Sequence, residues 1–248
     1  NKCLVDTFDR NFQFNVEHVA LAKRADVFMV APASANIIGK IAGGIADDML
    51  STTIMPAKCP KIIAPAMNTG MIENPIVQDN IKKLESYGYE IVESATGYLA
   101  CGDTGKGKLP DAEVLQDYIL KAIAKEKDMA GVSLLVTAGP TREAIDPVRY
   151  ITNHSTGKMG YAIARQAMLR GADVTLVTGK VDIEPPRFVN VVDITSAQDM
   201  YEAVMERSRE QDVIIKAAAV ADYRPTEVAE HKIKKADGDM SIKLSRTK

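Results

Sequence analysis

Short apolar runs that alternate with helical segments constrain the fold of this chain more than any other sequence feature. Such runs occupy residues 27–31, 61–64 and 133–138, and a proline or glycine follows each of them. A run of apolar residues without alternation is typical of a strand that is buried on both faces, as in a parallel sheet. The intervening segments are long enough for the crossover helices that parallel strands require. The pattern therefore predicts βαβ units.

Two series of these units follow one another. The first has a further strand at 89–92 and helices at 17–24, 37–42, 46–55, 76–87 and from Pro110-Asp111 to about 127. The second adds strands at 172–177, 189–192 and 213–217 and helices at 158–170 and 197–209. A charged stretch, Lys125-Glu126-Lys127-Asp128, separates the two series. We therefore predict an α/β protein with two tandem doubly wound parallel-sheet domains, at residues 1–128 and 129–248.

The charge balance and the cysteines narrow the functional classes. Lys and Arg number 31 against 33 Asp and Glu, so no basic field favours nucleic acid or an anionic membrane as partner. The apolar runs are too short to span a bilayer. The cysteines Cys3, Cys59 and Cys101 form no C-x-x-C pair, which argues against a disulfide framework and a zinc site. A reducing cytoplasm is the expected compartment.

Polar side chains follow the first two predicted strands. Ser34 and Asn36 come after the first and begin a helix, where hydroxyls and backbone N–H groups suit a phosphate or a polar cofactor edge. An ordinary helix cap explains them equally well. Asn68 follows the second strand, where its amide can donate to a carboxylate or form a turn with Thr69 and Gly70.

Cys101 and His18 are candidates for proton transfer. Cys101 lies in a predicted loop with three glycines and two lysines, a setting that keeps a thiol accessible and favours its thiolate. An inert small hydrophobe is the competing interpretation. His18, with an ordinary pKa near ~6.5, suits proton transfer at neutral pH. Histidines at helix starts are usually structural or solvated.

Anion-binding patterns in the second half differ in strength. Gly139-Pro140-Thr141 follows a strand but matches neither G-x-G-x-x-G nor the P-loop, so it is weak evidence for a nucleotide. The stretch 153–158 precedes a helix, is dense in donors and is a better anion site. The run 232–235 is either a solvated charged face or a flap that closes over phosphates. Residue chemistry alone thus predicts a two-domain enzyme that handles anions and a cofactor.

Five motifs in order carry a family resemblance. They are Ala31-Pro32-Ala33-Ser34-Ala35-Asn36, Pro65-Ala66-Met67-Asn68-Thr69-Gly70-Met71, Ala100-Cys101-Gly102-Asp103, and the stretches 137–160 and 217–235. Together they resemble the bacterial bifunctional coenzyme A biosynthesis family, a fused phosphopantothenoylcysteine decarboxylase and phosphopantothenate–cysteine ligase. The resemblance implies a flavodoxin-like, flavin-dependent cysteine decarboxylase domain at 1–128 and a Rossmann-like ligase domain at 129–248. It also implies homo-oligomers, with trimeric decarboxylase domains and dimeric ligase domains.

The resemblance assigns roles in the first domain. FMN would contact Ser34, Ala35, Asn36, Ile37 and Ala66. Asn68 would hold the substrate carboxylate, His18 would act as base, and Cys101 would be the proton donor. Flavin oxidation of the cysteinyl thiol creates the electron sink that lets CO2 leave, and the same flavin then reduces the product.

The resemblance also assigns roles in the second domain. CTP, as co-substrate, would activate the carboxylate of 4'-phosphopantothenate as an acyl-cytidylate, which the amine of cysteine attacks. Charge on the phosphate oxygens makes Mg2+ and a lysine expected, and the lysine would be Lys232. Lys216, Ala217, Ala218 and Asp222 would line the nucleotide site, and Asn153 would assist at the acyl-cytidylate.

The sequence departs from the family pattern at several positions, and two other functions are possible interpretations of it. Ile72 stands where the family usually has Trp, and Lys108-Leu109 replaces Arg-Met. The chain lacks the family's N-terminal Gly/Ser turn and the later ligase motifs, so we expect a fragment. An NAD-dependent two-domain oxidoreductase is disfavoured by the missing G-x-G-x-x-G. A non-enzymatic flavoprotein regulator is disfavoured by Cys101, Asn68, His18 and the second domain.

Overall fold

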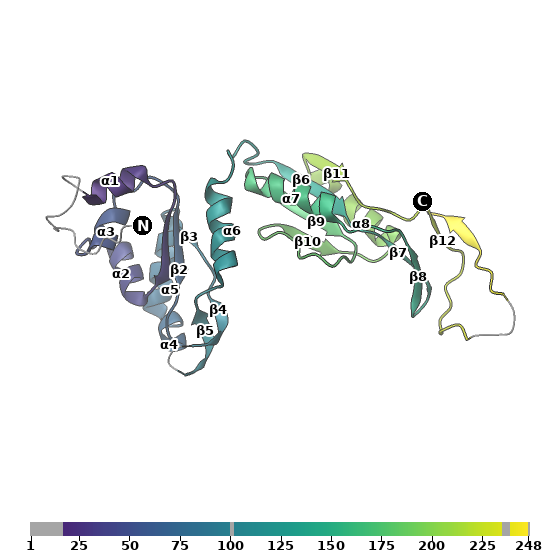
Figure 1. Cartoon of the computed structure of the whole chain (residues 1–248), viewed down its shortest axis with the longest axis horizontal. Coiled ribbons are helices and arrows are strands. Elements are labelled where there is room, and N and C mark those ends of the chain that lie inside the picture. Colours follow the sequence, from purple (N-terminus) through teal and green to yellow (C-terminus); the bar gives the residue numbers. More distant parts are fainter. Residues whose placement is uncertain (1–16, 100–101, 235–238, 248) are drawn as a thin grey trace. The chain divides into compact units, whose positions relative to one another are not determined.

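The computed structural model describes residues 17–99, 102–234 and 239–247 and divides into two compact units (Figure 1). The units are Asn1–Ala124 and Lys125–Lys248, and each contains a parallel sheet with helices on both faces. Cys3 and Cys101 lie outside the described residues. An α/β architecture with parallel sheets is therefore confirmed.

The sheet of the first unit has the order β1-β2-β3 and is parallel throughout. Its strands are β1 (Phe28–Ala33), β2 (Lys61–Pro65) and β3 (Glu90–Ile91). β1 continues through Pro32, where the sequence predicts an end. The ladder to β2 shifts register between Val30 and Ala33, and a proline without an N–H is tolerated at such an irregularity.

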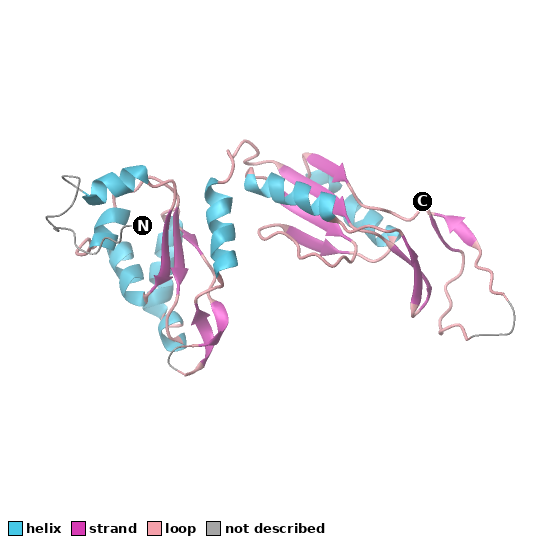
Figure 2. Ribbon diagram, in the orientation of Figure 1, coloured by secondary structure: helices cyan, strands magenta, loops and turns pink. Residues whose placement is uncertain are grey.

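Helices cover both faces of this sheet. α2 (Ala35–Gly43) and α5 (Pro75–Ser86) pack on one face in a core that includes Val30 and Ile63. α6 (Ala112–Ile123) packs on the other face, over Ile62 and Ala64 (Figure 2). Neighbouring residues of β2 enter different cores because successive side chains of a strand point to opposite faces. α6 ends at Ile123, short of its predicted end near residue 127.

Three shorter helices complete the described part of the first unit. α1 (Glu17–Arg24) packs on α3 (Met49–Ile54), and α4 (Thr69–Ile72) is a single turn after β2. α3 begins later than predicted, because Asp48 caps its N-terminus instead of lying in its first turn.

The two strands of a hairpin lie on either side of Cys101, in a part of the chain where the sequence predicts only a loop. β4 (Ala95–Tyr98) and β5 (Thr104–Lys108) pair antiparallel, with Tyr98 opposite Thr104. β5 contains glycines and lysines but no alternating apolar residues, so hydrophobic periodicity does not predict this strand.

The second unit has a four-stranded parallel sheet of order β10-β9-β6-β11. The strands are β6 (Ser133–Ala138), β9 (Asp173–Thr178), β10 (Asn190–Asp193) and β11 (Val213–Lys216). α7 (Lys158–Leu169) packs so closely that a Cβ on Gly160 would lie 2.6 Å from the Cβ of Ala138. α8 (Ala197–Arg207) covers the opposite face, over Leu135 and Val177, and the short 3-10 helix η1 (Ser208–Glu210) follows it.

Two antiparallel pairs extend from this unit and are absent from the sequence prediction. β7 (Arg142–Asp146) pairs with β8 (Arg149–Thr152), and β12 (Tyr223–Pro225) pairs with β13 (Leu244–Arg246). Within the described part of the chain, no helix combines the length and the apolar character needed to cross a membrane.

Candidate active sites

The carboxyl ends of β1 and β2 bring the first group of candidate residues together. The two strands are parallel neighbours, and the N–H of Ala66 donates to the carbonyl of Ala33 at 3.0 Å. Ser34 caps α2 by accepting the N–H of Ile37 at 3.4 Å. Ser34 and Asn36 are exposed at this edge, where open α/β sheets bind their ligands.

This edge fits a flat cofactor with polar margins. The hydroxyl of Ser34, the amide of Asn36 and the positive end of the nine-residue helix α2 supply hydrogen-bonding groups and dipole. Ala35 and Ala66, both half-buried, have small side chains that allow a ring to approach the backbone. Ile37 differs from the other predicted residues, since its side chain lies in the core and its N–H is bound to Ser34.

Asn68 lies at the same edge, after β2. It caps α4, and its Oδ1 accepts the N–H of Gly70 at 2.8 Å, which fixes the plane of the amide. The sequence left two interpretations open for this residue, and the turn is present.

The β4–β5 hairpin is fastened to the turn that carries Asn68. The N–H of Met67 donates to the carbonyl of Gly107 at 3.0 Å, and the hydroxyl of Thr69 donates to the carbonyl of Lys106 at 3.0 Å. A Cβ on Gly107, which has φ +120°, would overlap the carbonyl oxygen of Met67. A Cβ on Gly105 would overlap the Thr69 hydroxyl. The strands on either side of Cys101 are therefore held beside Asn68.

Thr69, Gly105 and Gly107 fasten the hairpin to the Asn68 turn, and sequence reasoning did not single them out for this role. The available signal was the Gly-x-Gly spacing at 105 and 107, since glycine within a strand often marks a close approach of another backbone.

His18 is not brought to this edge within one chain. It is half-buried near the start of α1, which packs on α3. Figure 1 places α1 at the end of the first unit opposite to α4, β4 and β5.

An ion cluster joins α2 to the start of α3. The ammonium of Lys40 lies 2.6 Å from Asp47 and 2.9 Å from Asp48. The hydrogen bond from Lys40, helped by the N–H of Ser51, lowers the pKa of Asp48 to about 2. Among the described residues, no group of three or more His, Cys, Asp or Glu side chains is arranged to hold a metal ion.

In the second unit, buried threonines tie the loop after β11 to the end of β6. The hydroxyl of Thr137 accepts the N–H groups of Ala217 and Ala218 at 3.2 and 3.3 Å. The hydroxyl of Thr141 accepts the N–H of Ala221 at 3.0 Å. The Gly139-Pro140-Thr141 turn, weak evidence for a nucleotide in the sequence, thus binds a neighbouring loop through Thr141.

The residues predicted to bind the nucleotide do not all line one cavity. Lys216 and Ala218 line a cavity of about 280 Å³ together with α8 side chains that include Met200 and Tyr201. Asp222 lines a separate cavity of about 560 Å³. Ala217 lies between Lys216 and Ala218 with its N–H on Thr137, and Lys232 is among the lining residues of neither cavity.

Asn153 connects the end of β8 to the loop after β11. Its Nδ2 donates to the carbonyl of Val220 at 3.1 Å and to that of Ala219 at 3.4 Å. The structure therefore places Asn153 beside the loop that carries three of the predicted nucleotide residues.

Comparison with known families adds independent information. The family model of the flavoproteins matches residues 1–124, and the model of the DNA/pantothenate metabolism flavoprotein C-terminal domain matches residues 129–248. The Bacillus subtilis coenzyme A biosynthesis bifunctional protein CoaBC is 48% identical over 245 residues, which cover 98% of this chain. This chain belongs to the bifunctional coenzyme A biosynthesis protein family. The Haemophilus influenzae member is 45% identical over 95% of the chain.

Other similar proteins differ in name and in length. A cysteine/cysteine sulfinic acid decarboxylase from an unknown prokaryotic organism is 44% identical over the whole chain, which covers 70% of that relative. A crystal structure of the C-terminal domain of CoaBC is 52% identical over 48% of this chain and 55% of its own length, with a TM-score of 0.42. The chain spans about 60% of the length of the bifunctional relatives.

Proposed function

We propose that the first unit decarboxylates 4'-phosphopantothenoylcysteine to 4'-phosphopantetheine with FMN, in coenzyme A biosynthesis. The observation that carries this proposal is the single sheet edge that holds Ser34, Asn36 and Asn68, with the hairpin fastened to it. Membership of the flavoprotein family supports FMN as the cofactor.

The residues of the chain would divide the work as follows. Bound FMN supplies a two-electron oxidation of the cysteinyl side chain and the later reduction. Ser34 and Asn36 would hydrogen-bond the cofactor, with Ala35 and Ala66 against it and Ile37 behind it. Asn68 would donate from its amide to the substrate carboxylate and so orient it for loss of CO2. The thiol of Cys101 would give its proton to the carbon chain that remains.

For the second unit, we propose the preceding step, a CTP-dependent ligation of 4'-phosphopantothenate with cysteine. The 280 Å³ cavity beside Lys216 and Ala218, with Ala217 in the same loop, would take part of the nucleotide. Lys232 and a Mg2+ ion brought with CTP would balance phosphate charge, near Asp222. Asn153 would act at the activated carboxylate.

The proposal includes an assembly of identical chains in the cytoplasm. Because α1 lies at the opposite end of the unit from Asn68, a base role for His18 at this edge requires a second copy of the chain. Trimeric decarboxylase and dimeric ligase units are the arrangement that the family resemblance implies.

The test is a mass analysis of products on the 248-residue chain. We expect a flavin absorption spectrum after addition of FMN and a product lighter by CO2 from 4'-phosphopantothenoylcysteine. With 4'-phosphopantothenate, cysteine, CTP and Mg2+, we expect ligation and release of pyrophosphate. Cys101→Ser should leave the first reaction at the enethiol that remains after CO2 is lost and so block release of 4'-phosphopantetheine. Lys232→Gln should slow the ligation alone.

The same assays distinguish two ways in which the proposed function could fail. Flavin binding without decarboxylation would favour a flavoprotein regulator. Decarboxylation without CTP-dependent ligation would restrict the proposal to the first unit.

A further inference from the structure

Asp146 is a buried carboxylate that the proposed mechanism does not use. It ends β7, and none of its side chain is exposed. Its Oδ1 accepts the N–H groups of Val148 and Arg149, each at 2.8 Å, and so closes the turn to β8. Its Oδ2 accepts Nη1 of Arg149 at 2.9 Å and the N–H of Ile233 at 3.1 Å. One carboxylate thus joins the hairpin tip to a residue 87 positions away.

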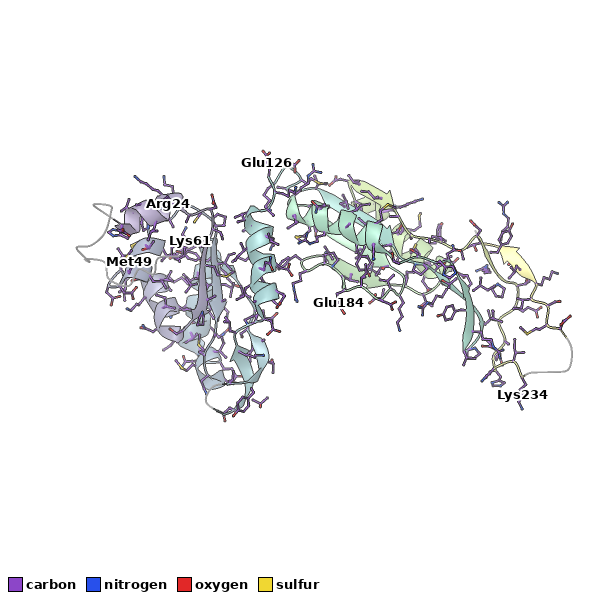
Figure 3. The ribbon with its side chains drawn as sticks, viewed as in Figure 1. Arg24, Met49, Lys61, Glu126, Glu184 and Lys234 are labelled. Atoms are coloured by element: carbon purple, nitrogen blue, oxygen red, sulfur yellow. The ribbon has the colours of Figure 1, made fainter. Side chains whose placement is uncertain are left out.

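The segment that Ile233 belongs to, residues 226–234, is here called the strap. Nη1 of Arg149 also donates to the carbonyl of Ile233 at 3.2 Å, so both backbone groups of this residue are bound. Closer to β12, the N–H of Ala229 donates to the carbonyl of Ile145 at 3.0 Å. Lys232 and Lys234 flank Ile233, and Figure 3 labels Lys234 at the end of the strap.

Apolar packing contributes little to holding the strap. Lys232 and Lys234 are exposed, and Ile233 is half-buried. A cavity of about 490 Å³ lies between the strap and residues 240–243, with Ile145, Val228 and Ile233 among its lining residues. The hydrogen bonds to Asp146 and Arg149 therefore carry much of the attachment.

Burying a carboxylate is unfavourable unless hydrogen bonds compensate it. Burial acts to raise the pKa of Asp146, but the N–H groups of Val148, Ile233 and Arg149 and the charge of Arg149 outweigh it. The pKa therefore lies below its ordinary value. The carboxylate stays ionised at neutral pH and accepts every one of these bonds.

The other end of the β7–β8 hairpin contacts the loop after β11, in which three of the predicted nucleotide residues lie. The hydroxyl of Thr152 donates to the carbonyl of Thr141 at 2.7 Å, and Asn153 contacts Val220 and Ala219. We propose that Asp146 is a positioning residue that fixes the backbone beside Lys232, so that this lysine meets the anionic ligand of the second unit. This inference rests on the proposed ligase function of that unit.

The variant Asp146→Asn should weaken the attachment of the strap while it keeps the hydrogen bonds of the β7–β8 turn. An asparagine keeps the shape and one acceptor for the N–H groups of Val148 and Arg149. Its amide nitrogen, however, would face two donors, Ile233 N–H and Arg149 Nη1. Asp128→Asn is the matched control, because Asp128 also binds an arginine, Arg170, through two bonds of 2.8 and 2.6 Å and has no hydrogen bond to the strap.

Three measurements on the full chain test the proposal. We expect Asp146→Asn to speed amide hydrogen exchange in the strap by about tenfold or more, because hydrogen bonds to a charged group are lost. We expect the KM for CTP to rise by about tenfold, the same loss expressed as ligand affinity. Decarboxylation in the first unit should not change, and Asp128→Asn should match the wild type in all three.

Ile233→Pro is the second variant, since it removes the N–H donor and leaves Asp146 and its turn intact. It should reproduce the faster exchange of the strap and the higher KM for CTP if Asp146→Asn fails to fold. Unchanged strap exchange in the variant that folds would overturn the proposal. Faster exchange with unaltered kcat and KM would also overturn it.

A wild-type chain without ligation would contradict the proposed function separately. Binding of inorganic pyrophosphate, measured by calorimetry, then replaces the kinetic readout. Weaker binding by Asp146→Asn would support the positioning role. Equal binding, or no binding by the wild type, would overturn it.

Discussion

Gly107 shows how the absence of one side chain can position a whole hairpin. Its φ of +120° lies in a region that L-residues rarely adopt, and its Cα faces the carbonyl of Met67. The N–H of Met67 donates to the carbonyl of Gly107 at 3.0 Å, so the two backbones meet directly. Any Cβ at position 107 would push the hairpin away from Asn68.

We predict that Gly107→Ala destabilises the chain far more than Gly88→Ala. Gly88 also has a positive φ, +83°, but a Cβ there would meet nothing within 4 Å. Backbone strain alone should cost about 1 kcal/mol at position 88. Overlap with Met67 should raise the cost at position 107 to about 3 kcal/mol or more. Urea unfolding measures both, and equal losses would refute the close-approach argument.

Sequence motifs singled out Ser34, Asn36 and Asn68 as polar residues that follow predicted strands, because strand ends are local features. They did not predict Thr69 or Asp146. The partner of Thr69 lies 37 residues away, and Ile233, the partner that joins Asp146 to the strap, lies 87 residues away. A hydrogen bond of such sequence separation leaves no periodic signal, so these residues appear only when the chain is folded.

Capping and an ion pair combine at the start of α3. The carboxylate of Asp48 accepts the N–H of Ser51 at 2.7 Å, and the hydroxyl of Ser51 accepts the N–H of Asp48 at 3.2 Å. Lys40, on α2, adds its ammonium to the same carboxylate at 2.9 Å. Lys40 of α2 is therefore joined to the start of α3 through Asp48, which is partly buried.

We predict that the stabilisation from the Asp48 charge disappears in acid. The folded pKa of about 2 lies below the unfolded value, so the contribution is complete above an unfolded pKa near ~3.9 and is lost as the pH falls toward 2. Asp48→Asn keeps a capping oxygen and removes only the charge. Because the side chain of Asp48 is 42% exposed and solvent screens it, we expect a difference below about 1 kcal/mol at pH 7.

Urea unfolding of both proteins between pH 7 and pH 3 measures this difference. It should be constant down to pH 5 and shrink below pH 4. A difference that is as large at pH 3 as at pH 7 would contradict the assignment of the charge.

Elements with hydrophobic periodicity were predictable, and the hairpins were not. The positions of β2, β6, α5 and α7 follow from apolar runs, caps and glycine stops. β5 reads Thr-Gly-Lys-Gly-Lys, which has no apolar alternation, and its pairing depends on the Met67 contact. β12 and β13 pair although they are far apart in the sequence, and a local sequence pattern does not predict such a pairing.

At the scale of the whole molecule, the chain has separate cores. The clusters around Ile63 and around Ile62 belong to the first unit, and the cluster around Leu135 belongs to the second. None of the three contains residues from both units. Compact units with their own cores can unfold independently.

We therefore predict two calorimetric transitions. Gly107→Ala should lower the temperature of one transition and leave the other within about 1 °C, because a local loss of stability stays within its cooperative unit. Differential scanning calorimetry measures both at once. An equal downward shift of both transitions would show that the units unfold together.

The fastening of the hairpin to the Asn68 turn also bears on how this enzyme family diversifies. Met67 and Thr69 form their hydrogen bonds with Gly107 and Lys106 of β5, so a side chain of β4 such as that of Tyr98 can change without breaking either bond. Under the proposed function, adaptation to a different substrate would then begin at an exposed position of β4 such as Tyr98.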